Sequence, residues 1–240
     1  MKTDNKKLCL NCGTKLQGKY CHNCSQESHT ERLTIKEFFL HDIVHGVWHF
    51  DKGLLFTLKE VLIKPGKMAM NYIQGKRVRY YNFFYLSLIL IGLIIFFKMH
   101  SFATTSSEND HNLKYFFLSL LPLMVLSSVI IYKKLKLNIA EHTVIAGVNL
   151  VAFLLLMLIF YSIIAILNYF EITYNAKLIR NFFYALGILN SIRVYFQAFR
   201  SFYSKWFIPF QKAISTVSLY LGFLLISLIG LAFIINSILN

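Results

Sequence analysis

Four cysteines near the amino terminus have the spacing that most directly indicates chemistry in this chain. Cys9 and Cys12 form one Cys-x-x-Cys pair, Cys21 and Cys24 form a second, and the 240 residues contain no other cysteine. Each pair can fold into a tight turn that points two thiolates at one ion, and two such turns complete the tetrahedral set of soft ligands that zinc favours. The sequence therefore predicts a small zinc ribbon that binds one structural Zn²⁺ per chain.

Other chemistries could use the same thiols. A disulfide framework needs an oxidising compartment, and the first residues contain no apolar signal that would export them. Covalent haem needs His directly after a Cys pair, whereas Gly13 and Ser25 occupy those places. An iron–sulfur cluster or a single iron could bind the four thiolates, but nothing nearby resembles an electron-transfer partner. Gly13 supplies the permissive backbone that a zinc-binding turn needs, and Ser25 stands where a second glycine is expected.

The segment after the ribbon predicts an amphipathic helix. Thr34-Ile-Lys-Glu37 is a capping box, and an apolar run with helical periodicity follows it. The helix is about four turns long, which is too short to span a bilayer, so we expect it along the membrane surface or against the rest of the protein. Its polar face carries three histidines and one aspartate: His41, Asp42, His45 and His49.

This polar face has two interpretations. Adjacent histidines four residues apart could hold a metal ion, but His41 and His49 lie about 12 Å apart along a helix and cannot share one. The face could simply meet lipid headgroups. Alternatively, His41, Asp42 and His45 could form a second metal or catalytic site with a later residue such as Glu141 or His142.

A short basic segment precedes the first long apolar run. Its cations are Lys76, Arg77 and Arg79, and two tyrosines follow. Cations at the headgroup level followed by interfacial aromatic residues are typical of a cytoplasmic helix entrance. The segment lacks a nucleotide-binding fingerprint, so the sequence predicts contact with lipid headgroups instead.

The overall composition is that of a membrane protein. Hydrophobic residues make up 56% of the chain and charged residues only 15%. The net charge of +14 does not favour nucleic acid as a partner, because 14 of the 25 Lys and Arg residues precede residue 80 and the others flank apolar runs.

Five apolar runs predict an all-α polytopic membrane protein. They cover about residues 81–99, 115–132, 144–170, 181–199 and 213–239. About twenty apolar residues match a hydrocarbon core of about 30 Å. The fourth run contains Asn190, Arg193 and Gln197, so four spans are the alternative, and Arg193 is expected to turn inward. The predicted domains are a zinc ribbon (1–30), amphipathic helices (31–80) and a transmembrane domain (81–240).

The loop charges predict the orientation. With the ribbon inside, the inner side holds 21 of the 25 Lys and Arg residues. The outer side holds four: Lys98, Lys114, Lys177 and Arg180. The positive-inside rule therefore places the amino terminus in the cytoplasm, where cysteines stay reduced.

An ordered set of motifs resembles an uncharacterised bacterial membrane-protein family, a domain of unknown function with an amino-terminal zinc ribbon. The motif positions are Cys9, Cys12, Cys21, Cys24, His41, Asp42, His45, Asp51, Lys52, Gly53, Thr57, Pro65, Gly66, Gly75, Lys76 and Arg77. The resemblance implies the bacterial inner membrane and the architecture above, but no activity.

Two functions remain open from the sequence. The first is a non-enzymatic membrane protein whose cytoplasmic ribbon docks a protein partner or lipid, since a module that folds on metal presents a rigid surface. The second is a membrane-embedded metal-dependent enzyme or small-solute transporter that uses His41, Asp42 and His45.

Overall fold

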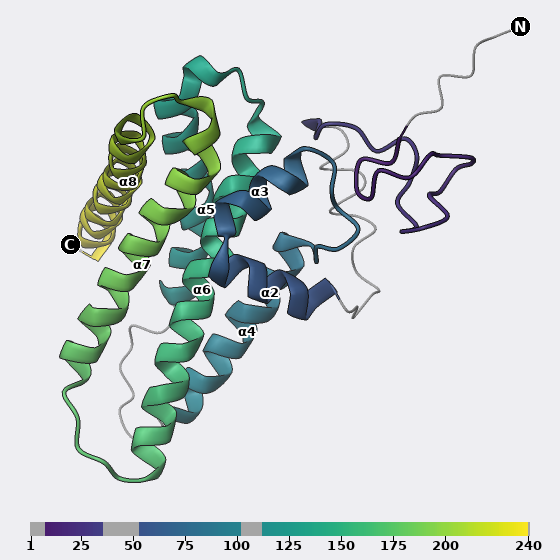
Figure 1. Cartoon of the computed structure of the whole chain (residues 1–240). Coiled ribbons are helices and arrows are strands. Elements are labelled where there is room, and N and C mark those ends of the chain that lie inside the picture. Colours follow the sequence, from purple (N-terminus) through teal and green to yellow (C-terminus); the bar gives the residue numbers. More distant parts are fainter. Residues whose placement is uncertain (1–7, 36–52, 102–111, 240) are drawn as a thin grey trace, which may run out of the picture.

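The described part of the protein is a helical bundle with a small cysteine-rich module at one end (Figure 1). The computed structural model describes residues 8–35, 53–101 and 112–239. Its α-helices are α2 (Gly53–Ile63), α3 (Pro65–Ile73), α4 (Phe83–Ser101), α5 (Asn112–Tyr132), α6 (Ile139–Tyr169), α7 (Ala176–Phe199) and α8 (Phe207–Leu239), and its 3₁₀ turns are η4 (Lys133–Leu135) and η5 (Arg200–Phe202). In these residues β pairing is limited to two isolated bridges, both in the cysteine module. The amphipathic helix predicted after Thr34 falls mostly on residues 36–52, outside the described ranges.

All five predicted apolar runs form helices, α4 to α8. Four of these helices begin earlier than the predicted apolar runs, at Asn112, Ile139, Ala176 and Phe207. Their first two turns contain polar and charged side chains, such as Glu141 in α6 and Lys212 in α8, which an apolar pattern does not include. The difference is therefore confined to the helix ends.

Two helices are long and apolar enough to cross a membrane. They are Ile139–Tyr169 and Phe207–Gly230, the latter being the greater part of α8, and Phe83–Lys98 is a shorter apolar helix. The described residues thus support a helical protein with two candidate spans. Five crossings stay a prediction.

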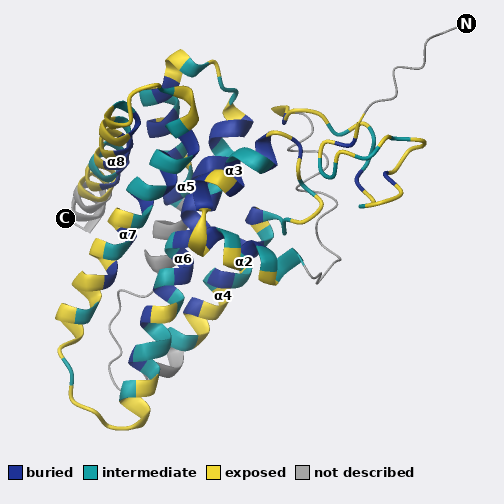
Figure 2. Cartoon of the chain, viewed as in Figure 1, coloured by how far each residue is buried: buried dark blue, intermediate teal, exposed yellow. Residues whose placement is uncertain are grey.

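Helix α6 lies at the centre of the bundle and packs against α3, α4, α5 and α7. Its first turn is fixed by a capping box, in which the Asn138 side chain accepts a hydrogen bond from the Glu141 amide and the Glu141 carboxylate accepts one from the Asn138 amide, both at 2.9 Å. Buried residues cover most of its amino-terminal two-thirds (Figure 2). One continuous core joins it to Leu33 and to α3, so the ribbon connector and the bundle share their interior.

The outside of the bundle is apolar. Large hydrophobic side chains such as Phe182, Leu189, Leu225 and Ile226 are exposed on α7 and α8 (Figure 2). Soluble monomers rarely expose apolar surface on this scale, whereas helices that face lipid do so routinely.

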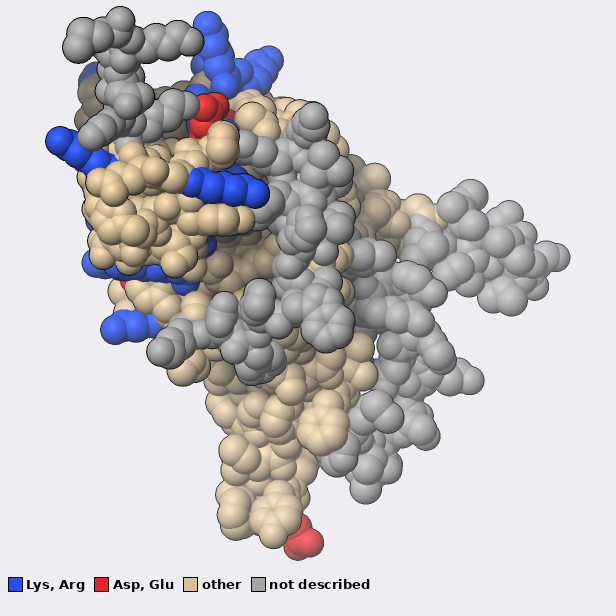
Figure 3. All heavy atoms as spheres, turned by 90° about the vertical axis from the view of Figure 1, so that its right-hand side faces the viewer, with Lys and Arg blue, Asp and Glu red and all other residues tan. Residues whose placement is uncertain are grey.

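Lys and Arg side chains are unevenly distributed on one face of the bundle. Figure 3 shows, on the face drawn, Lys and Arg side chains gathered at the end that carries the cysteine module, a shaft of uncharged residues below them and an acidic side chain at the far end. The other end is the turn between α6 and α7, where Glu171 is exposed. The basic end is the one that the charge pattern of the sequence assigns to the cytoplasm.

Two short helices, α2 and α3, form a corner that packs on the bundle. Pro65 does more than stop α2, because it occupies the first turn of α3, where its missing amide costs no hydrogen bond.

Arg193 of α7 turns inward as predicted and donates hydrogen bonds to Asn190 and to the carbonyl of Leu62, both at 2.7 Å. The guanidinium of Arg193 therefore offsets the partial negative charge at the carboxyl end of α2.

Candidate metal centre

The two cysteine pairs adopt the same backbone turn, twelve residues apart. In the first, the Gly13 amide donates to the Cys9 carbonyl at 2.8 Å and the Cys9 amide donates to the Thr14 carbonyl at 2.9 Å. In the second, Ser25 donates to Cys21 at 2.8 Å, and Cys21 donates to Gln26 at 2.7 Å. This local repeat was not recognised in the sequence, although Asn-Cys occurs at the same place in both pairs.

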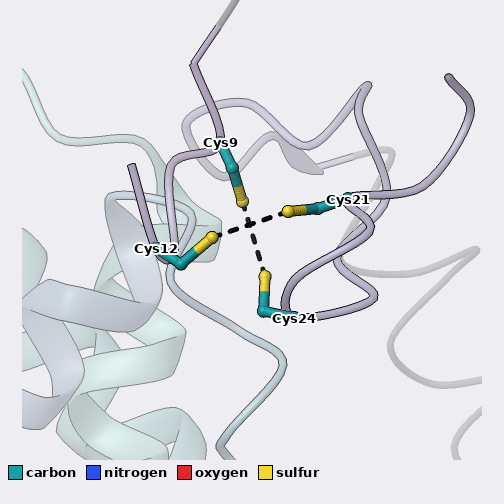
Figure 4. Close-up of side chains that lie close together, drawn as sticks. All are labelled: Cys9, Cys12, Cys21 and Cys24. Atoms are coloured by element: carbon teal, nitrogen blue, oxygen red, sulfur yellow. Dashed lines mark hydrogen bonds between the residues drawn. The ribbon is translucent and has the colours of Figure 1, made fainter. Parts of the chain in front are cut away.

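All four sulfur atoms point to one centre (Figure 4). They lie within 4.8 Å of one another, with Cys9 Sγ 3.6 Å from Cys24 Sγ and Cys12 Sγ 3.5 Å from Cys21 Sγ. These distances are far longer than an S–S bond of about 2.05 Å, so the thiols are free. A tetrahedral zinc with Zn–S bonds of about 2.3 Å separates its ligands by about 3.8 Å. The tetrad therefore fits a metal ion such as Zn²⁺.

The surroundings of Cys9 and Cys12 shift the pKa values of these two thiols in opposite directions. Burial raises the pKa of Cys9 to about 11. Hydrogen bonds with the side chain and backbone of Thr14 lower the pKa of Cys12 to about 6. A bound cation stabilises the thiolate form of every ligand, so metal binding releases protons and weakens as the pH falls.

Ser25 occupies a backbone conformation that suits glycine. Its φ is 61°, and the equivalent Gly13 of the first turn has a φ of 76°. A non-glycine residue in this left-handed region costs roughly 1–2 kcal/mol, because its Cβ crowds the following carbonyl oxygen. The sequence prediction that glycine belongs here agrees with this geometry.

Ser25→Gly is therefore expected to stabilise the ribbon by about 1 kcal/mol and to raise the zinc affinity roughly fivefold. Zinc competition with a chromophoric chelator measures the change. Gly13→Ser is the matched control, because a Cβ at Gly13 would meet nothing within 4 Å and would add only backbone strain. It should weaken zinc binding by a similar factor, and equal affinities in all three proteins would contradict the explanation.

Gln26 fastens the second turn to the helical body. Its buried side chain accepts a hydrogen bond from the Arg77 amide at 3.4 Å and donates one to the Gly75 carbonyl at 2.8 Å. Gly75 has a φ of 93°, and a Cβ there would lie 2.8 Å from the side chain of Leu10 in the first turn. Both cysteine turns thus rest on the segment that follows α3.

The connector after the ribbon makes the second attachment. Leu33 is fully buried, donates its amide to the Ile73 carbonyl at 3.1 Å and accepts a hydrogen bond from the Asn138 side chain at 2.8 Å. Beside it, Arg32 forms a bidentate ion pair with Glu141, whose side chain is 0% exposed. A buried carboxylate without a partner is costly, so this pair ties the ribbon to the first turn of α6.

The structure does not describe the residues of the suggested second metal or catalytic site. His41, Asp42, His45 and His49 lie outside the described residues. Their suggested partners are engaged elsewhere, since Glu141 pairs with Arg32 and His142 is hydrogen-bonded to Ser128 at 2.8 Å.

The three basic residues predicted to bind lipid differ in their surroundings. Lys76 and Arg79 are exposed. Arg77 lies 5.6 Å over the Tyr72 ring and donates to the Glu31 carbonyl at 3.1 Å, so it also braces the connector. The lipid role of all three residues stays a prediction.

Comparison with known families finds a match over residues 51–97. That range matches the model of a family described as a protein of unknown function (DUF3667). No curated protein and no solved structure matches the chain. The match covers α2, α3 and most of α4 but not the cysteines, and it supports the resemblance to an uncharacterised domain of unknown function.

Three motif positions inside the DUF3667 match are packing contacts. A Cβ on Gly53 would lie 3.1 Å from the Arg79 carbonyl, so α2 approaches the segment before α4 closely. The buried Thr57 hydroxyl accepts a hydrogen bond from the Tyr81 amide at 2.7 Å. Gly66 lets α3 touch the backbone of α7. These residue types are therefore explained by the corner that supports the ribbon.

Proposed function

We propose that this chain is a multi-pass protein of the bacterial inner membrane, with five transmembrane helices, whose cytoplasmic zinc ribbon is a docking platform for a protein partner. The observation that carries the proposal is the double attachment of the cysteine module, through Gln26 and through Arg32, to the basic end of an apolar bundle. The positive-inside rule assigns that end to the cytoplasm, where thiols stay reduced and zinc binding is favoured.

The outward side of the ribbon supplies the docking face. Leu8 is 57% exposed and Tyr20 is 56% exposed, at equivalent places ahead of the two cysteine pairs. Lys19 lies 5.7 Å over the Tyr20 ring. Apolar and aromatic side chains on a rigid, preorganised module suit binding, because little conformational entropy is lost when a partner arrives.

A photo-crosslinking amino acid in place of Tyr20, in the full-length protein in cells, tests the proposal. We expect a specific protein adduct that disappears when Cys9→Ser is added, because the face depends on the metal-bound fold. The matched control is the same amino acid in place of Tyr169, which is exposed near the carboxyl end of α6 at the far end of the bundle. The Cys9→Ser protein should remain in the membrane fraction, and an adduct of unchanged yield would contradict the metal-dependent face.

The alternative function, an enzyme or transporter built on His41, Asp42 and His45, depends on residues outside the described ranges. No described residue favours it over docking. A second metal equivalent per chain, lost on changing His41 and His45 to Ala, is the result that would favour it.

A further inference from the structure

Two turns that are distant in the sequence meet at the basic end of the bundle. The first is η4 with Lys136, and the second runs from η5 into the start of α8. Lys212 of α8 donates to the Ile131 carbonyl at 3.0 Å and lies 5.7 Å over the Tyr132 ring. Tyr132 in turn stacks on Phe199, with ring centroids 3.6 Å apart. These contacts hold the two turns in one surface.

The cations of this surface are exposed and not offset by acids nearby in the chain. Lys133, Lys134 and Lys136 are exposed on the first turn, and Lys205 is exposed on the second. Neither stretch, 133–138 or 200–212, contains Asp or Glu. The next carboxylate along the chain from η4 is Glu141, which is buried and paired with Arg32.

Aromatic side chains lie beside these lysines. Trp206 is 64% exposed, and Phe202, Phe207 and Phe210 are exposed as well. The rings of Trp206 and Phe210 are 6.4 Å apart. Aromatic rings beside lysines are characteristic of the level at which lipid headgroups meet hydrocarbon, since an indole combines an apolar body with a polar N–H group.

The apolar exterior of the bundle begins directly below the lysines. On α5, Leu126 and Ile130 are exposed in the two turns before η4, and on α8, Ile214 is exposed two residues after Lys212. The surface therefore changes from cationic to aromatic to aliphatic within a few helical turns. A nucleic acid would contact only the cationic part, whereas a phospholipid has a charged headgroup, a glycerol level and acyl chains that meet all three.

We propose that η4 and the α7–α8 turn, with Lys133, Lys134, Lys136, Lys205 and Trp206, form a binding surface for the headgroups of anionic phospholipids. This inference rests on the membrane location in the proposed function. The ammonium groups donate hydrogen bonds to lipid phosphate oxygens, while the aromatic rings pack at the glycerol level. Its residues are different from Lys76, Arg77 and Arg79, which precede α4.

The two tryptophans of the chain permit a site-specific test. Trp48→Phe leaves Trp206 as the only tryptophan in the full-length protein. This variant is reconstituted in two kinds of vesicle, which contain equal mole fractions of brominated phosphatidylglycerol (anionic) or brominated phosphatidylcholine (zwitterionic). We expect the anionic lipid to quench Trp206 more strongly, with a local preference of roughly fivefold or more at low salt. High salt should reduce the preference.

A triple variant assigns the effect to the first turn. Changing Lys133, Lys134 and Lys136 to Gln should remove the preference while leaving quenching by both lipids. The matched control changes Lys177 and Arg180 to Gln, because both are exposed near the amino end of α7, at the opposite end of the bundle. That protein should keep the preference of its parent. If the triple variant does not fold, Lys205→Gln alone should reduce the preference.

The outcomes separate the inference from the proposed membrane location. Equal quenching by the two lipids in the parent protein would overturn the anionic-lipid surface and leave the membrane location intact. Quenching by neither lipid would overturn the membrane location of this end. A preference that survives in the triple variant would overturn the assignment to the η4 lysines.

Discussion

Replacing Gly66 by alanine is expected to destabilise the protein by about 3 kcal/mol, or roughly 10 °C in melting temperature. The new Cβ would lie 2.5 Å from the Val194 carbonyl oxygen and would also overlap the Ala198 amide and the Gln197 Cβ. Two of these three atoms belong to the backbone of α7, which cannot rotate away. Helix α3 must therefore move off α7, and the hydrogen bond from the Gly66 amide to Gln197 is lost.

Thermal unfolding in detergent, followed by circular dichroism, measures the effect. Gly92→Ala and Gly222→Ala are matched controls, since a Cβ at either helical glycine would meet nothing within 4 Å. In these controls alanine should be neutral or stabilising because of its higher helix propensity. If the Gly66→Ala protein had the same melting temperature as the two controls, α3 would not pack on α7 in this way.

Removing the metal is expected to unfold the ribbon completely. Among residues 8–35, the buried apolar side chains are Cys9, Cys21 and Leu33, so little besides the metal holds the module together. Structural zinc contributes about 10–16 kcal/mol of apparent binding free energy in small zinc-binding peptides, more than such a core can replace. A Cys21→Ser protein, or the wild type with a strong chelator, should lose the amide protection of residues 8–30.

Hydrogen exchange and elemental analysis together measure this effect. Wild type should carry one zinc per chain, as should the variant with His41 and His45 changed to Ala, and Cys21→Ser should carry none. His22→Ser is the matched control, since His22 is exposed in the same turn and is not a ligand of the tetrad. Amide hydrogen exchange should also become faster at the start of α6, because unfolding of the ribbon breaks the ion pair between Arg32 and Glu141. Protection of residues 8–30 that persists without metal would contradict a metal-dependent fold.

The metal tetrad could be predicted because its determinants are local. All four ligands lie within sixteen residues, and Cys-x-x-Cys spacing alone brings two sulfurs together. The apolar runs likewise predicted α4 to α8, since each helix satisfies its own backbone. Their ends were less well predicted, because a search for apolar residues passes over polar first turns. The start of α6 is nevertheless marked locally by the Asn138–Glu141 capping box, whereas Lys212 of α8 is explained only by its bond to the Ile131 carbonyl.

The attachment of the ribbon could not be predicted. Gln26 bonds to Gly75, 49 residues away, and Arg32 pairs with Glu141, 109 residues away. No local pattern marks either residue, and many side chains could satisfy the same geometry. Gly66 was recognised as part of a motif, but only its approach to α7 explains why the motif needs glycine.

The ion pair between Arg32 and Glu141 also constrains how the chain is assembled during synthesis. The ribbon precedes the helices in the chain and can fold on metal before they are made, because its four ligands are close in sequence. Its last contact waits for Glu141, which is made only after α4 and α5. The ribbon can therefore be folded before its partner carboxylate is made, and its Arg32 pairs with Glu141 once α6 begins to form.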